Sequence, residues 1–288
     1  MNISHLHVLA AIAKYGSFST AAIHLDSSQS AVSRAIATLE DDLGVTLLVR
    51  GRFGARLTPV GERVLTHARK ILQLQERIES EVNSHKGLNG GHLRIASFRS
   101  AATHLLPPVI AQFRQRFPGV DISLDELDPL GVERALREGA ADIGLLPLPR
   151  SEEFETWEVV RDEFVVLLPE QVQAPEKLSW AYLAQHEFIL YNYAECTSVV
   201  RRHWVQWDQS LDVAYEIKED STIVSMVAQG LGAAILPHLA ALPIPAGVQV
   251  RSLPVPLVRV VGAAIAANTL QPPATFVFLE LLRGDALF

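Results

Sequence analysis

Apolar residues recur at helical spacing in three short segments at the start of the chain. The first segment predicts a helix that Ser4 caps and Gly16 ends, because serine and glycine favour those two helix boundaries. The second predicts a helix that Ser17 caps and that Asp26, with the serines before Gln29, interrupts. The chain therefore begins with short helices joined by tight turns.

The third predicted helix lies within residues 27–45 and ends at Gly44. It has one apolar stripe, formed by Val32, Ile36, Leu39 and Leu43. At about 100° per residue, Ser30 and Arg34 point away from this stripe, and Gln29 and Ser33 lie on one flank. Two short helices that cross at alanines are typical of a helix-turn-helix. A small polar face with one arginine suits the DNA major groove, and the alternative is a solvated face of an ordinary helical bundle.

Two short strands, Thr46–Val49 and Ala55–Thr58, are predicted around a glycine-containing turn. Arg50, Arg52 and Arg56 cluster there. Arginines on a β-wing beside a DNA-reading helix can contact phosphates or enter the minor groove. The alternative is an arginine-rich loop in solvent.

The charge of the chain is divided unevenly. The net charge is −7, yet residues 1–86 carry 10 basic and 8 acidic side chains, and the remainder carries 15 and 24. A polyanion would therefore bind at the front of the chain.

At this point a family resemblance becomes specific. The segments "GSFSTAA", "SQSAVSRAIATLEDDLGVTLL", the arginine that follows and "LTPVGE" resemble the winged helix-turn-helix of LysR-type transcriptional regulators. One departure is Leu48-Val49, where the family most often has an aromatic residue. The resemblance implies a sequence-specific DNA-binding regulator whose DNA contacts are Gln29, Ser30, Ser33, Arg34, Arg50, Arg52 and Arg56.

Residues 59–86 form one long helical pattern that begins at Pro59. Its apolar positions keep near-heptad spacing, which leaves a stripe in need of a partner. In the family the equivalent helix pairs with a second chain, and the alternative is packing against the same chain. Glycines at residues 87–92 then predict a hinge.

The rest of the chain alternates strands and helices, which predicts α/β lobes with parallel strands. "LRIAS…LLP", "FPGVDISL", "ALREGAADIGLL" and "MVAQGLGAAILP" resemble the effector-binding region of the same family. The implied fold class is α+β overall: a winged helix-turn-helix (1–58), a linker helix (59–86) and a two-lobed α/β domain of periplasmic-binding-protein type. Its lobes are expected at 93–162 with 265–288, and at 163–264.

A small-molecule effector is expected between the lobes, where strands end and helices begin. Free backbone N–H groups and hydroxyls there would hold a carboxylate or another small anion. The alternative is that these hydroxyls only cap their helices. The candidate residues are Ser97, Arg99, Ser100, Cys196, Thr197, Ser198, Ser221 and Thr222.

Cys196 is the one cysteine, so no disulfide can form within the chain. Its expected place at a helix start would lower the pKa of its thiol, and it resembles the peroxide-reactive cysteine of the family's oxidant-sensing branch. A one-cysteine redox sensor is therefore an alternative function, although Glu195 opposes thiolate formation and no resolving cysteine is present.

Other classes of protein fit the sequence less well. It has no phosphate loop, nucleophile elbow or metal motif, which argues against an enzyme, and no export signal, which argues against a solute-binding protein. We expect no cofactor and no membrane segment, and a cytoplasmic location. The implied partners are double-stranded promoter DNA, an effector, RNA polymerase and a second copy in a homodimer or homotetramer.

Overall fold

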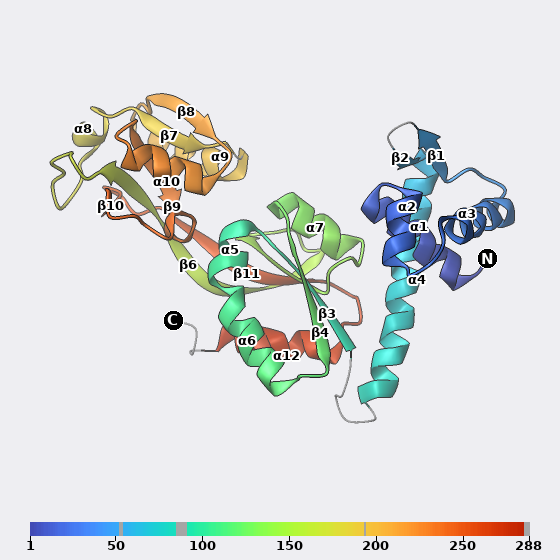
Figure 1. The fold of residues 1–288 in the computed structure, drawn as a ribbon. Helices are drawn as coiled ribbons and strands as arrows, with labels where there is room; N and C mark the ends of the chain where they lie inside the picture. Colours follow the sequence, from blue (N-terminus) through green and yellow to red (C-terminus); the bar gives the residue numbers. More distant parts are fainter. Residues whose placement is uncertain (52–53, 85–90, 193, 285–288) are drawn as a thin grey trace.

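The structure is a computed structural model that describes residues 1–51, 54–84, 91–192 and 194–284. Figure 1 shows a helical head on a long helix at one side, a first α/β lobe in the middle and a second lobe at the far end. The α+β fold class expected from the sequence is confirmed. Among the described residues, no helix is long and apolar enough to cross a membrane.

The head contains the three expected helices, α1 (Ile3–Tyr15), α2 (Phe18–His24) and α3 (Gln29–Leu43). The boundaries at Gly16, Ser17 and Gly44 are confirmed, since both glycines are left-handed and the Ser17 hydroxyl accepts from the Thr20 amide. The Ser4 cap was wrong: Asn2 is the N-cap, and its side chain accepts from the Ser4 amide. The helix begins before Ser4, so the side-chain oxygen of Asn2 caps its first turn in place of the Ser4 hydroxyl.

Three of the four stripe residues of α3 are buried in the head core, together with Leu6, Leu9 and Ile12 of α1. Leu43, the fourth, is 37% exposed because it lies in the last turn, beyond the packing helices. Most of the sequence-predicted stripe is therefore confirmed.

The wing is a hairpin of β1 (Leu48–Gly51) and β2 (Gly54–Leu57), with Arg50 opposite Ala55. It docks on the α1–α2 turn, where the Ala55 amide donates to the Gly16 carbonyl at 2.9 Å. A Cβ on Gly54 would lie 2.3 Å from that carbonyl oxygen. The Glu40 carboxylate accepts from the amides of Leu47 and Leu48 and fixes the wing to α3.

The long helix α4 (Pro59–Ser84) begins at Pro59 as expected. Its first half packs on the head through Leu65, Ala68 and Leu72, which supports the alternative of packing within the chain. Further along, Leu74 and Ile78 are 54% and 64% exposed. The expected hinge falls mostly on residues 85–90, outside the described residues, and Gly91 and His92 already belong to the next strand.

Lobe I is built on strands β3 (Gly91–Ser97), β4 (Val120–Glu126) and β5 (Ile143–Leu148). Helices α5 (Arg99–His104), α6 (Leu106–Arg116) and α12 (Pro273–Arg283) cover one face, and α7 (Pro129–Arg137) covers the other. Ile95 and Ala96 point to opposite faces, as do Leu145 and Leu146. A sheet covered on both sides explains these continuous apolar runs.

Lobe II repeats the arrangement with β7 (Phe188–Tyr191), β8 (Val213–Ile217), β9 (Ala233–Pro237) and β10 (Val248–Ser252). Helices α8 (Trp180–Leu183) and α9 (Ala194–Gln206) cover one face, and α10 (Asp220–Ala228) covers the other. The short α11 (His238–Ala241) follows β9 and contacts α5 of lobe I.

Two long strands, β6 (Phe154–Pro169) and β11 (Val258–Ala266), join the lobes. Residues 154–163 of β6 pair with β11, and residues 164–167 pair with β9. In the sequence, the apolar run "FVVLLPE" predicts a strand over the second half of β6 only, and no strand is predicted at β11. The expected return to lobe I at residue 265 was also wrong, because residues 260–264 already pair with β5.

Candidate functional site

The exposed face of the head is a groove between α2, the start of α3 and the wing. Its described lining is Ser17, Phe18, Ser19, Gln29, Ser30, Ser33, Gly51 and Gly54. Gln29 is exposed, and its Oε1 accepts from the Ser19 hydroxyl at 3.2 Å. The groove thus carries hydroxyls and an amide at a helix N-terminus, groups that bind phosphates and base edges.

Three of the four expected arginines lie in elements that contribute residues to this groove. Arg34 is exposed on α3, and Arg56 is exposed on β2. Arg50 lies in β1. The last residue of this strand, Gly51, lines the groove. Arg52 lies outside the described residues.

A second concavity of about 320 Å³ lies between the two lobes. Its polar lining includes Arg99, Ser100, Glu126 and Asp128 from lobe I, and Tyr191, Asn192, Cys196, Lys218, Glu219 and Asp220 from lobe II. Its apolar lining includes Leu127, Pro129, Pro147, Leu236 and Pro237. Apolar walls with a few convergent polar groups are typical of a ligand pocket.

The structure brings only some of the eight predicted effector residues to this cavity, namely Arg99, Ser100 and Cys196. Ser97 is buried, and its hydroxyl donates to the Phe98 carbonyl at 3.1 Å.

The remaining predicted hydroxyls lie elsewhere. Thr197 donates to the Tyr191 carbonyl, and Ser198 donates to the Glu195 carbonyl. Ser221 and Thr222 are exposed on α10, outside the lining of the cavity.

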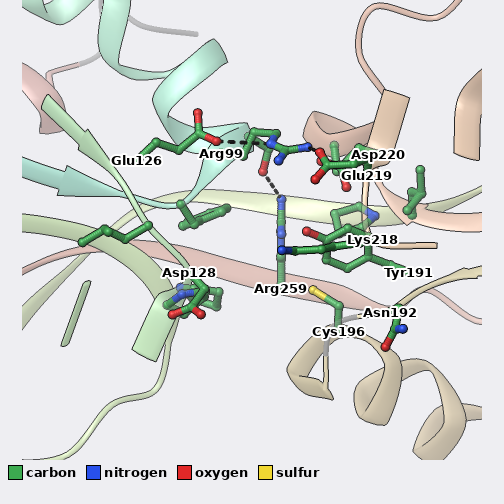
Figure 2. Close-up of a pocket in the computed structure, with 18 residues that line it drawn as sticks. Arg99, Glu126, Asp128, Tyr191, Asn192, Cys196, Lys218, Glu219, Asp220 and Arg259 are labelled. Atoms are coloured by element: carbon green, nitrogen blue, oxygen red, sulfur yellow. Dashed lines mark hydrogen bonds and ion pairs between the residues drawn. The ribbon is translucent and has the colours of Figure 1, made fainter. Parts of the chain in front are cut away.

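Arg99 connects the lobes across the cavity. It donates to Glu126 in lobe I at 3.2 Å and forms an ion pair with Glu219 in lobe II, and Figure 2 shows its side chain between the two carboxylates. The hydrogen bond to Glu219 is the main reason that the pKa of Arg99 is raised, and the same bond lowers the pKa of Glu219. The bridge connects the lobes in the arrangement that the structure describes.

Arg259 was missed because the sequence did not predict its strand. Its guanidinium donates from Nε to Asp162 at 2.8 Å and from Nη2 to the Ser100 hydroxyl at 2.8 Å. It also lies 5.0 Å from the centre of the Phe98 ring. Asp162 accepts from the Leu239 amide, so this buried pair ties β6, β11, α5 and α11 together where the lobes meet.

Asp220 is a second residue that the sequence did not single out, because attention fell on the hydroxyls of Ser221 and Thr222. Its side chain is 9% exposed and lines the cavity. Burial raises its pKa to about 6, Arg99 and Arg259 oppose the shift, and Glu219 and Glu126 add to it. With Glu219 as N-cap, two carboxylates begin α10. The cavity therefore differs from the anion-binding helix end that we expected.

We predict that Asp220→Asn stabilises the ligand-free protein at neutral pH. Because the folded-state pKa of about 6 lies above the ordinary value of 3.8, the ionised carboxylate lowers stability as pH rises through this interval. The gain from Asn should be about 3 kcal/mol near pH 8 and should fall toward zero near pH 4. Urea denaturation of both proteins across this range measures it, and a gain that does not change with pH would contradict the prediction.

Cys196 lies in the first turn of α9, yet its thiol is not activated. Burial raises the pKa of the Cys196 thiol, Arg259 lowers it, and Asp220 and Glu195 raise it further. The lowered pKa expected from the helix start was therefore wrong, because burial and two nearby carboxylates outweigh the helix end. This environment does not favour the redox alternative.

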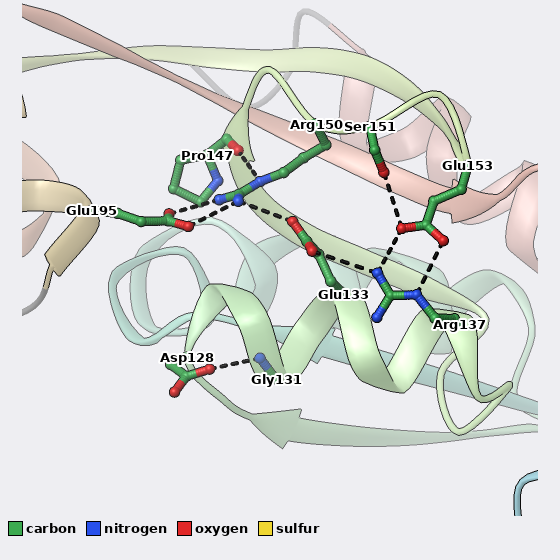
Figure 3. A network of polar contacts seen from close by, with 9 residues as sticks. All are labelled: Asp128, Gly131, Glu133, Arg137, Pro147, Arg150, Ser151, Glu153 and Glu195. Atoms are coloured by element: carbon green, nitrogen blue, oxygen red, sulfur yellow. Dashed lines mark hydrogen bonds and ion pairs between the residues drawn. The ribbon is translucent and has the colours of Figure 1, made fainter.

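A second inter-lobe contact involves Arg150, which follows β5 in lobe I and is 10% exposed (Figure 3). It donates to both carboxylate oxygens of Glu195 in lobe II, at 3.0 and 2.8 Å, and to Glu133 of α7 at 3.0 Å. Burial lowers the pKa of Arg150, but the two carboxylates outweigh it and raise the pKa overall. In the part of the chain that the structure describes, ion pairs thus join the lobes at two places.

The helix α7 extends from the cavity toward the head. Asp128, its N-cap, and Pro129, its first residue, line the cavity. At the other end Glu138 forms an ion pair with Arg69 of α4. One short helix therefore contacts both the cavity and the helix that carries the head.

Comparisons with known proteins agree with this division. Residues 3–62 match the bacterial regulatory helix-turn-helix family of lysR proteins, and residues 86–286 match the LysR substrate binding domain. The protein described as "Probable HTH-type transcriptional regulator LrrA" from Synechococcus elongatus is 67% identical over 287 residues, covering 99% of this chain and 98% of that protein.

Solved structures share the whole fold. A full-length OxyR variant from Pseudomonas aeruginosa is 26% identical with a TM-score of 0.75, and the match covers 98% of both chains. A full-length CbnR in complex with its target DNA is 21% identical with a TM-score of 0.72, covering 98% of this chain and 99% of that chain. The chain belongs to the LysR family of transcription regulators, proteins that bind DNA under the control of an effector.

Proposed function

We propose that the cavity between the lobes is the effector site and that its occupancy sets the affinity of the head for an operator. The observation that carries this proposal is α7, which begins at the cavity and ends at an ion pair with α4. A ligand changes the operator affinity only through unequal affinity for two arrangements of the protein. Operator affinity measured with and without a ligand of the cavity tests it, and an unchanged affinity with bound ligand would refute it.

The proposed DNA contacts are the groove at the start of α3 and the wing. Arg34 would pair with a guanine or a phosphate, Gln29, Ser30 and Ser33 with base edges or phosphates, and Arg50, Arg52 and Arg56 with the backbone. Residues 1–58 would act as the reading head and residues 59–86 as its linker.

We further propose a dimer, or a dimer of dimers, on an inverted-repeat site. Leu74 and Ile78 are exposed on α4, beyond the part that packs on the head, and a second copy of the helix would cover them. Two heads gain affinity and specificity from two half-sites. RNA polymerase would be a further partner, in the cytoplasm, and the chain would act by binding alone, without catalysis.

The ion pair between Arg69 and Glu138 offers a test of the route from lobe I to the head. We predict that Arg69→Glu or Glu138→Arg alone changes operator affinity by about 3- to 10-fold, because each places like charges at the contact. The double reversal should restore the wild-type affinity. Fluorescence anisotropy on one operator measures all four proteins, and a double variant no better than the singles would contradict the proposed route.

A further inference from the structure

Asp220 is a buried carboxylate that faces the cavity without a partner of its own. Its side chain is 9% exposed, and no described residue forms a hydrogen bond or an ion pair with it. Figure 2 shows it next to Glu219 on the lobe II side of the cavity. Proteins rarely bury a charge to this extent without a partner, because the carboxylate loses part of its hydration without compensation.

The cations near Asp220 are already engaged or exposed. Arg99 is shared between Glu126 and Glu219, and the Nε and Nη2 groups of Arg259 are held by Asp162 and Ser100. Lys218 is exposed. The Asp220 carboxylate is therefore available to accept a hydrogen bond from a donor outside the chain.

The charged residues that line the cavity also favour a cationic ligand. Among the described residues of the cavity, four are acidic, Glu126, Asp128, Glu219 and Asp220, and three are basic, Arg99, Lys218 and Arg259. Since Asp162, which lies outside this lining, neutralises Arg259, the remaining lining groups are net negative. A cation would be attracted to this cavity and an anion would be repelled.

We propose that the effector carries a protonated amine that binds the Asp220 carboxylate, and an apolar body that lies on Leu127, Pro129 and Leu236. This inference rests on the proposed function, because it takes the cavity as the effector site. An ammonium group supplies both the charge and the donors that Asp220 lacks. The volume of about 320 Å³ suits a small molecule.

The test uses full-length protein and matched probes that share a body but differ in the polar group. The amines are isoamylamine and phenethylamine, the carboxylates are isocaproate and hydrocinnamate, and isoamyl alcohol is the neutral probe. We expect the amines alone to raise the melting temperature of the wild type. By calorimetry, Asp220→Asn should weaken the binding of the amines by about 10- to 100-fold.

The control is Glu216→Gln, which also removes a carboxylate of lobe II but lies outside the cavity lining, in an ion pair with Arg201. It should bind the amines as the wild type does. Failure of both amines to bind, or equal binding by Asp220→Asn, would overturn the proposal. A carboxylate that binds and changes operator affinity would overturn the ammonium assignment but leave the proposed regulatory function standing.

Discussion

Arg34→Ala is expected to lower operator affinity by about 10- to 100-fold at fixed salt, since a bidentate contact to a base contributes about 1–3 kcal/mol. Arg34 is exposed on α3, on the side opposite the buried stripe of Val32, Ile36 and Leu39. Its removal therefore leaves the head core intact. Fluorescence anisotropy gives the affinity, and circular dichroism and light scattering check the fold and the oligomeric state.

The matched control is Arg114→Ala, which removes an exposed helical arginine from lobe I, far from the head. It should bind DNA as the wild type does, because the charge lost is outside the proposed interface. Equal affinity of the wild type and Arg34→Ala for the operator would show that α3 does not read DNA through this residue.

The second large effect is expected at the inter-lobe contact of Arg150. Arg150→Ala leaves Glu133 and Glu195 without their shared cation and should lower the free energy of unfolding by about 2–3 kcal/mol. This is less than for a fully buried pair, because Glu195 is 35% exposed and can regain water. Small-angle scattering should also show a larger radius of gyration, since the ion pair between Arg150 and Glu195 no longer connects the lobes.

Arg137→Ala is the control that separates the loss of an ion pair from the loss of a contact between the lobes. Arg137 belongs to the same network but pairs with Glu153 and Glu133, all within lobe I. Its loss should cost less than about 1 kcal/mol, because the guanidinium is half exposed, and should leave the radius of gyration unchanged. An equal expansion in both variants would mean that Arg150 does not hold the lobes together.

The head and the individual lobe elements could be predicted because their patterns are local. The stripe of α3 follows the helical period, and Gly16 and Gly44 end helices where only a left-handed residue fits. The strands β6 and β11 could not be predicted in full, because their partners are far apart in sequence. In β6 the first half, "FETWEVVRDE", mixes polar and apolar residues without regular alternation, unlike the continuous apolar run of its second half.

Only part of the candidate site could be predicted, because the contacts of its residues also depend on segments that are far apart in the sequence. Hydroxyl-bearing residues at helix starts are visible in the sequence, but Ser97, Thr197 and Ser198 donate to backbone carbonyls close to them in the chain. Arg259 reaches the cavity only because β11 returns to lobe I beside Asp162. Asp220 could not be identified from the sequence, because its burial and its lack of a partner are visible only in the structure.

We propose that this chain reads DNA through α3 and the wing as a symmetric oligomer. Selection from a random-sequence DNA library with full-length wild type and Arg34→Ala, followed by sequencing, tests it most directly. We predict that the wild type enriches an inverted repeat and that Arg34→Ala loses or broadens it at matched positions in both halves. Enrichment of no motif by the wild type, or of an identical motif by both proteins, would contradict the account.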